Sequence, residues 1–448
     1  MTGSGPSCPL RLATMKTTRM HVQLRIRVAI AIAMLGGASA EAQVLPGVEL
    51  PRAPVIGDMV DDTLDTVDRT LRSTNLRELR KVQMRDLVRK HRRVLERDAR
   101  GEPVIRREVL SLAPSEEALE VAEAAGFSIA REQAFDELGT RIVVLLAPER
   151  MSARRALRRL QELDPKGTYD YNHLYTGSGD TPGALTSSVA PPAHAPPARA
   201  AAVRIGLIDG GVLQTHSVFG TTTFRAHGCD GLDVPSAHGT SVASLIAAQV
   251  DDRALELFSA DVYCDQPTGG SVTAIAAAFA WMAREHVPII NVSLVGPSNR
   301  MLEQLVRAMI ERGHVIVAAV GNDGPNAKPL YPAAYEGVVG VTGVDRRERA
   351  LPEALRGRQV DFAAAGADIA AASLDGRYTL VRGTSFAAPI VAALLATDCG
   401  DVMPGSQRVL LEKYSQLARD LGAPGFDPTY GFGLLSASVV ETHARRVE

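Results

Sequence analysis

The part of the chain after residue 201 contains four short, continuous apolar runs that alternate with stretches of helical periodicity. The runs, rich in β-branched residues, are Arg204–Ile208, Ile289–Leu294, Val315–Val320 and Val338–Val341. Helical patterns such as Val272–Arg284 and Met301–Arg312 lie between several of them. Strands that are apolar along their whole length are typical of a parallel sheet buried on both faces, and the helices supply its two covering layers. The sequence therefore predicts an α/β fold with three layers.

A smaller set of elements precedes this region, between residues 102 and 175. Strands are expected at 104–112, 127–135, 141–147 and 169–175, and helices at 115–125 and 152–163. The order βαββαβ is that of a split-βαβ, ferredoxin-like domain. Because about 70 residues form only a thin core, we expect this domain to pack against its neighbour.

Two segments of different composition flank the small domain. Residues 176–201 are rich in Pro, Ala, Gly and Ser, which predicts an exposed linker. Residues 52–100 are charged, with apolar residues three or four apart, and predict helix. The looser part of this repeat consists of Leu76, Leu79, Leu87 and Leu95. One interpretation of the segment is a basic helix that binds a membrane surface or an acidic partner. The other, which we favour, is a solvated helix in which Asp and Glu are interlaced with the basic residues.

The N-terminus has the features of an export signal, assigned to residues 1–42. Lys16, Arg19, Arg25 and Arg27 precede the apolar run Val28–Leu35, and the small residues Ala38-Ser39-Ala40 follow. This order is that of a secretory signal peptide, so we expect export to the periplasm or the medium. A buried N-terminal strand or helix is the alternative, and Met15 or Met20 could serve as the start.

Export would permit disulfides, and the cysteines allow one. Cys229 and Cys264 form a plausible pair, with Cys399 left over. Three buried thiols are the open alternative.

Composition excludes several classes of protein. Hydrophobic residues make up 46% of the 448 positions, which excludes disorder throughout the chain. The net charge is −2, so no basic field points to nucleic acid. No apolar run reaches about 18 residues, so no conventional membrane span is expected. The sequence contains no CxxC pair, the spacing that would suggest a zinc site.

Two candidate catalytic groups stand at the borders of predicted elements. Asp209 follows the strand Arg204–Ile208, and ligand sites in such sheets lie at the carboxyl ends of strands. His238 opens the helical run Ser241–Val250, where the helix dipole disfavours the imidazolium and helps to keep a neutral base. Each has an ordinary alternative, because Asp-Gly-Gly is a common turn and most lone histidines are structural.

Two further candidates follow. Asn322 ends an apolar strand, where its amide could donate to a developing oxyanion, although Asn-Asp-Gly is also a turn. Ser385 starts a long apolar helix whose N-terminus offers backbone N–H groups to an anionic transition state, although Ser is also a common N-cap. Pro389 is expected among the earliest helical positions, which need no N–H partner.

The order Asp, His, Ser is one of the known chain orders of the hydrolytic triad. Residues 203–436, within a domain assigned to 202–445, resemble the catalytic domain of the subtilisin-like serine proteases, the subtilases or peptidase family S8. The matching motifs are IGLIDGG, HGTSVASLIA, NVSLVGP, VAAVGNDGP, GTSFAAPIVAAL and YGFGLLSASV. The resemblance implies a subtilisin-like parallel sheet of about seven strands.

Roles for single residues follow from the resemblance. Ser385 would be the nucleophile, His238 the general base and then the general acid, and Asp209 the group that orients the imidazole. Asn322 and the Ser385 backbone N–H would form the oxyanion hole. Two segments would bind an extended polypeptide substrate by strand addition. Their residues are Ser293, Leu294, Val295, Gly296, Ala318, Ala319, Val320 and Gly321.

The sequence departs from the family pattern at Gly210, Ser241 and Ser244, none of which is a catalytic group. No cofactor or metal site is expected, and without a recognisable loop of acidic ligands, calcium dependence is unsupported.

The small domain is similar to the propeptide domains that fold and inhibit subtilases. This likeness implies that the chain's own N-terminal domain is an intramolecular inhibitor, with Tyr169–Tyr175 laid into the active-site cleft. Cleavage is expected near Tyr175 or within Thr176–Ala201.

The sequence therefore predicts an exported serine endopeptidase made as a self-inhibited precursor. A catalytically silent binding or chaperone-like module with the same fold is one alternative. A serine hydrolase that acts on other bonds is another, disfavoured because Ser385 does not lie in a G-x-S-x-G elbow.

Overall fold

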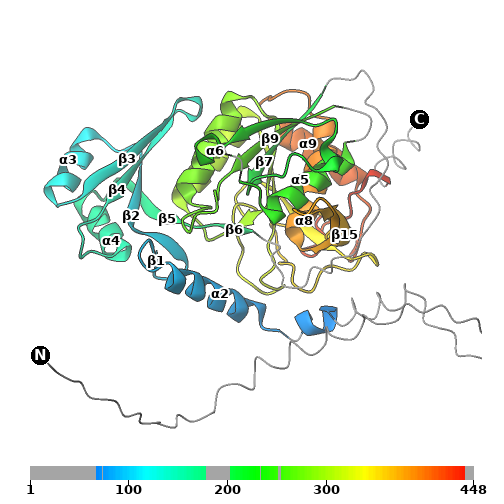
Figure 1. The fold of residues 1–448 in the computed structure, drawn as a ribbon, viewed down its shortest axis with the longest axis horizontal. Coiled ribbons are helices and arrows are strands. Elements are labelled where there is room, and N and C mark those ends of the chain that lie inside the picture. The colour runs from blue at the N-terminus through cyan, green and yellow to red at the C-terminus, as the bar shows by residue number, and fades with distance from the viewer. Residues whose placement is uncertain (1–66, 73, 178–201, 233, 251–253, 439–448) are drawn as a thin grey trace, which may run out of the picture. The chain divides into compact units, whose positions relative to one another are not determined.

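The computed structural model describes residues 67–72, 74–177, 202–232, 234–250 and 254–438 (Figure 1). These residues all belong to one compact unit, Val60–Glu448. The predicted signal peptide, residues 52–66 of the charged segment, most of the predicted linker and residues 439–445 lie outside the described residues.

The larger part of the structure is built on a seven-stranded sheet in which every neighbouring pair is parallel. Its strand order is β14-β13-β12-β10-β7-β9-β8. The strands are β7 (Val203–Asp209), β8 (Thr223–His227), β9 (Leu255–Asp261), β10 (Ile289–Val292), β12 (Val315–Ala319), β13 (Val339–Val344) and β14 (Phe362–Ala365). The predicted α/β fold is confirmed. One predicted run is divided, because Leu294–Val295 forms a separate strand, β11.

Helices cover both faces of this sheet (Figure 1). They are α5 (Ala237–Gln249), α6 (Val272–Arg284), α7 (Arg300–Arg312), α8 (Thr384–Thr397) and α9 (Ser406–Leu417). Side chains of α5, α8 and α9 share a core with Leu207, whereas side chains of α6 and α7 share another with Ile208. Because successive strand residues point to opposite faces, a continuous apolar run fills both cores. Among the described residues, no helix is long and apolar enough to cross a bilayer.

The helices that carry candidate site residues begin differently from the prediction. The Ser236 hydroxyl accepts from the Gly239 N–H at 2.9 Å and caps α5, so this helix starts at Ala237 and includes His238. In α8, Pro389 is the sixth residue and not among the earliest positions. Its missing N–H leaves the carbonyl four residues earlier, that of Ser385, without the usual helical donor.

The smaller part has a five-stranded antiparallel sheet. It contains β1 (Leu95–Arg97), β2 (Pro103–Leu112), β3 (Ser128–Phe135), β4 (Thr140–Leu146) and β5 (Thr168–His173), with α3 (Glu116–Ala124) and α4 (Ala153–Leu163). Strand β1 contradicts the prediction of helix to residue 100. Leu95, assigned to the helical repeat, is a buried residue of β1, and the helix before it, α2, covers only Leu76–Lys90.

This smaller sheet uses both of its faces. Val109 and Val143 pack against α3 and α4, whereas their neighbours Leu110 and Val144 join the core that contains α6 and α7. The small domain thus shares one hydrophobic core with the large sheet, which agrees with the expectation that it packs against its neighbour.

Candidate active site

Three of the predicted site residues meet at the carboxyl end of the large sheet. The Nε2 atom of His238 lies 3.0 Å from Ser385 Oγ, and its Nδ1 atom lies 2.9 Å from both carboxylate oxygens of Asp209. Asp209 and Ser385 are almost fully buried. The sequence separations are 29 and 147 residues, so only the fold brings the three together.

Each of the three residues occupies a defined place on its element. Asp209 is the last residue of β7, and His238 and Ser385 are each the second residue of a helix, α5 and α8. The backbone of α5 comes very close to the turn after Asp209, since a Cβ at position 239 would lie 2.1 Å from the Gly210 carbonyl oxygen. Glycine at 239 is therefore what lets His238 reach Asp209.

The departure at Gly210 has a local explanation. A Cβ at this position would lie 2.3 Å from Ser236 Oγ, so the N-cap hydroxyl of α5 fills the space. The Gly210 N–H still donates to Asp209 Oδ1 at 2.7 Å. The carboxylate thus keeps a backbone donor despite the missing side chain.

The partners decide which nitrogen of His238 carries the proton. An ionised carboxylate can only accept hydrogen bonds, so Nδ1 donates to Asp209. In the neutral imidazole the other nitrogen is then an acceptor, and Nε2 faces the Ser385 hydroxyl with its lone pair. The arrangement is suited to removal of the Ser385 proton.

Asn322 lies beside the start of α8. Its Oδ1 accepts from the Thr384 N–H at 3.2 Å, and Thr384 Oγ1 accepts from the Gly321 N–H at 3.1 Å. These two bonds fix the amide of Asn322 relative to Ser385. The first N–H groups of a helix have no partner within it, so the N-terminus of α8 adds backbone donors next to this amide.

Two residues that help to build the site, Thr384 and Asn291, were not predicted from the sequence. Asn291 Nδ2 donates to Ser293 Oγ at 2.9 Å, and Ser293 Oγ donates to the Ser385 carbonyl at 2.9 Å. This is the carbonyl that Pro389 leaves without a helical donor. Polar residues inside an apolar strand run were the available signal, because buried polar groups need partners.

Residues 174–177 run between β11 and Ser271 beside this site, and we call the space between these two segments the groove. Strand β6 (Thr176–Gly177) pairs antiparallel with β11, and Leu174 bridges to Ser271 on the other side. The predicted linker therefore does not begin at residue 176, because its first two residues are in this strand. A Cβ at Gly177 would lie 3.5 Å from His238 Nε2, so the strand reaches the imidazole.

The side chain of Tyr175 is enclosed by the protein in the same groove. It is fully buried, and its hydroxyl donates to the Pro297 carbonyl at 2.5 Å. A Cβ at Gly296 would lie 2.6 Å from the ring, so glycine there is required for the ring to fit. Burial raises the pKa of this phenol well above its ordinary value, so it remains a donor.

The first predicted substrate segment thus lies along a bound strand: Leu294 and Val295 pair with it, and Gly296 contacts Tyr175. The second segment is buried: Ala318 and Ala319 end β12, and Val320 follows them. Their contact with a substrate stays a prediction.

Helix α2 lies over the turn that contains Asn322. Leu76 packs on Gly324, and Arg80 forms ion pairs with Asp323 at 3.3 Å and Glu102 at 3.5 Å. A cavity lies between this helix and Gly177, Val295 and Asn322.

The helical residues 67–72 make a second contact with the large domain. Asp68 forms an ion pair of 2.6 Å with Arg382, which also binds Glu353 at 2.7 Å. Arg382 lies three residues before Ser385. The segment before the small domain is therefore attached at two places around the site.

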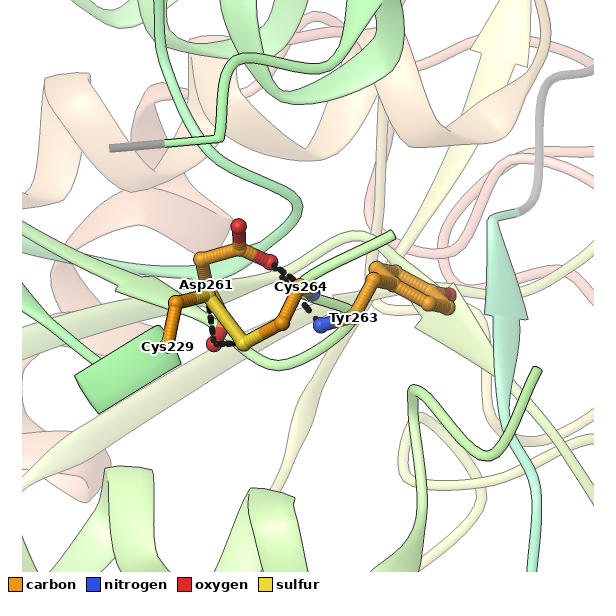
Figure 2. The surroundings of a disulfide bond; sticks show 4 residues. All are labelled: Cys229, Asp261, Tyr263 and Cys264. Carbon is orange, nitrogen blue, oxygen red and sulfur yellow. Dashed lines mark hydrogen bonds between the residues drawn. A yellow bond between two sulfur atoms is a disulfide. The ribbon is translucent and has the colours of Figure 1, made fainter. Parts of the chain in front are cut away.

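A disulfide joins Cys229 and Cys264, with Cα atoms 5.2 Å apart (Figure 2). Cys399 is a free thiol. Cys229, Cys264 and Asp261 cluster closely, but both sulfurs are bonded to each other and are not thiolate ligands for a metal.

Known proteins with related sequences share the large domain. The subtilase family model matches residues 201–433. Minor extracellular protease Epr of Bacillus subtilis (strain 168) is 30% identical over 247 residues, which cover 52% of this chain and 37% of that protein. Subtilisin DY of Bacillus licheniformis is 29% identical over 255 residues, which cover 53% of this chain and 90% of that protein.

A solved structure shares the fold. Fervidolysin from Fervidobacterium pennivorans, described as a keratinolytic enzyme related to subtilisin, aligns with a TM-score of 0.59 at 17% identity, over 76% of this chain and 61% of that chain. The chain spans just over a third of the length of Epr. The family model matches more than half of the 448 residues and includes Asp209, His238 and Ser385. The chain belongs to the subtilase family.

Proposed function

We propose that the protein is an exported serine endopeptidase that cleaves polypeptides through an acyl-enzyme intermediate and is made as a precursor inhibited by its own N-terminal region. The observation that carries this proposal is the pair of contacts of His238, with Ser385 Oγ at 3.0 Å and Asp209 at 2.9 Å. These contacts activate a hydroxyl that is otherwise a weak nucleophile.

In the first half of the reaction, Ser385 Oγ attacks the carbonyl carbon of the peptide bond and His238 Nε2 takes its proton. Asp209 stabilises the imidazolium that forms. The Asn322 amide and the Ser385 backbone N–H stabilise the negative charge on the carbonyl oxygen. His238 then gives the proton to the leaving nitrogen, the C–N bond breaks, and an ester with Ser385 remains. Water repeats the sequence and releases the acid.

A polypeptide substrate fits the groove better than a small ester. Strand β6 binds β11 through its backbone, and any extended peptide offers the same donors and acceptors. This backbone pairing favours a peptidase over a serine hydrolase for other bonds. The contact between His238 and Ser385 favours an enzyme over a silent binding module.

The same strand supports self-inhibition. Residues 174–177 occupy the groove up to His238 and exclude another peptide. We place the cleaved bond after Gly177, because that residue lies against the imidazole and the chain continues into residues 178–201. The N-terminal region would then remain bound as a product.

Export is supported by the signal-like residues 1–42 and by the Cys229–Cys264 disulfide, since disulfides persist in oxidising compartments. The name of one relative, Minor extracellular protease Epr, places that protein outside the cell.

The proposal is tested by intact mass after treatment with a fluorophosphonate, which transfers its phosphonyl group to an activated serine with loss of fluoride. We expect one adduct at Ser385 that is lost in His238→Ala and Ser385→Ala. Labelling only after removal of the N-terminal region would identify an inhibited precursor. If neither form is labelled, the silent binding module is the better proposal. Hydrolysis of peptides compared with esters separates a peptidase from another serine hydrolase.

A further inference from the structure

The loop between β9 and α6 forms the wall of the groove opposite β11. Its first residue, Val262, donates its N–H to the Asp209 carbonyl at 2.9 Å and accepts from the Gly270 N–H at 2.8 Å. Gly270 in turn accepts from the Tyr175 N–H at 2.7 Å. A series of backbone hydrogen bonds thus connects the strand in the groove with the end of β7.

Tyr263 in this loop binds the other backbone polar group of Tyr175, its carbonyl oxygen. Its hydroxyl donates to the Tyr175 carbonyl at 3.0 Å, so the loop holds both the N–H and the C=O of Tyr175. The Tyr263 ring is itself confined, because a Cβ at Gly270 would lie 2.8 Å from it. Since the contact is to the backbone, it is available to any extended peptide in the groove.

The disulfide anchors the turn from which Tyr263 extends. Figure 2 shows the tyrosine pointing away from the sulfur atoms, on the other side of Cys264. Asp261 Oδ1 accepts from the N–H groups of Tyr263 and Cys264 at 2.9 and 3.0 Å. The bonded Cys229 follows β8, one of the two edge strands of the large sheet.

Residues of the two bonded turns have backbone conformations that residues with a side chain rarely adopt. Cys264 and Asp265 have φ angles of 49° and 52°, and Cys229 has 55°. These left-handed conformations are unfavourable for residues with a side chain. A covalent bond between the two turns keeps both in place, and with them the direction of the Tyr263 side chain.

We infer that the Cys229–Cys264 disulfide positions Tyr263, and that Tyr263 holds the substrate backbone at the place that Tyr175 occupies in the precursor. The inference rests on the proposed function for the identity of the ligand. Tyr263 is a positioning residue, since it contacts the bound strand away from the reacting atoms. Extended peptides bind with full affinity only when the disulfide is formed.

Hydrogen exchange on the full chain tests the contact without any need for turnover. All proteins carry Ser385→Ala, so the strand stays uncleaved. We expect Tyr263→Phe to speed amide exchange in the segment containing Tyr175 by about 3- to 10-fold, the effect of one hydrogen bond. The double variant Cys229→Ser/Cys264→Ser should do the same, and Cys399→Ser, which removes the free thiol, should not.

Coupling separates the inference from a general loosening of the fold. In the protein that lacks the disulfide, Tyr263→Phe should add little further exchange, because the hydroxyl is already displaced. Equal effects of Tyr263→Phe with and without the disulfide would overturn the inference, as would unchanged exchange at Tyr175. Slow amide exchange in β10 shows that a variant is folded. If the double variant loses this protection, the test rests on Tyr263→Phe alone.

A second measurement uses the processed enzyme. Tyr263→Phe should lower kcat/KM by about 3- to 10-fold for peptides that extend to the Tyr175 position, mainly through KM. Shorter substrates should be unaffected, and an equal loss for both would contradict the assigned position. If the fluorophosphonate experiment fails while hydrogen exchange behaves as expected, the proposed function is wrong and the positioning of Tyr263 stands.

Discussion

The hydroxyl of Ser293 donates a 2.9 Å hydrogen bond to the backbone carbonyl of Ser385. Pro389 cannot supply the helical N–H that this carbonyl would otherwise accept. The side chain of Ser293, the residue that follows β10, therefore completes the first turn of α8 and ties the position of Ser385 to the sheet.

This relationship predicts a rescue between two substitutions. Ser293→Ala leaves buried polar groups unsatisfied and should lower the free energy of unfolding by about 1–3 kcal/mol. Pro389→Ala restores a helical donor for the Ser385 carbonyl, so Ser293→Ala should cost less in that background. Urea unfolding of both single variants and the double variant measures the coupling, and strictly additive losses would show that Pro389 and Ser293 do not share this carbonyl.

Asn322→Ala should lower kcat by about 10²–10³, the loss that removal of an oxyanion-hole amide causes in subtilisin, a member of the same family. KM should change little, because the charge on the oxygen develops only in the transition state. Asn326→Ala, an exposed residue of the same turn, is the matched control. Steady-state kinetics on a peptide substrate makes the comparison, and undiminished turnover would remove Asn322 from the site.

Arg80→Ala should weaken the attachment of α2 over the site, because Asp323 loses the cation 3.3 Å away. Burial raises the pKa of the Asp323 carboxyl, and the positive charge of Arg80 opposes this shift. We expect the fluorophosphonate to label the full chain several-fold faster. Arg85→Ala removes an exposed charge of the same helix and should leave the rate unchanged. Equal rates in all three proteins would mean that α2 does not limit access.

Asp361 predicts a pH dependence of stability. Burial raises its pKa from 3.8 to about 7, while its Oδ2 accepts from the Gly340 N–H at 2.8 Å. Between these pH values the folded protein keeps a proton that the unfolded chain releases. The free energy of unfolding should therefore fall as pH rises from about 4 to 7.

Asp361→Asn keeps an acceptor for Gly340 and removes the titration. We expect it to be more stable than the parent by about 1–3 kcal/mol at pH 8, less than the full shift implies because the residue is partly exposed. The two proteins should converge at low pH. Urea unfolding at pH 4, 6 and 8 tests this, and a constant difference across the range would assign the gain to something other than ionisation.

Local sequence was sufficient to predict the strands and helices that carry the site residues. The apolar run before Asp209 was predicted to be a strand from its own residues, and its β-branched residues fill the two cores that cover the sheet. The motifs around His238, Asn322 and Ser385 also predicted which side chains stand at strand ends and helix starts. Those features depend on residues within one or two turns of each other.

Contacts between distant residues were decided by the tertiary structure. Thr176 and Gly177 have a linker composition and become a strand only because β11 offers a partner. Tyr175 is anchored by a carbonyl 122 positions further along the chain. Helix α8 continues through Pro389 because Ser293 satisfies the carbonyl that is left over.

The physical reason for this division is the range of the interactions. Hydrophobic periodicity and capping act over a few residues, so they can be read from the sequence without knowledge of the fold. A backbone hydrogen bond across a groove, a buried ion pair such as that of Asp68 with Arg382, and the direction of Tyr263 depend on surfaces that exist only after the chain has folded.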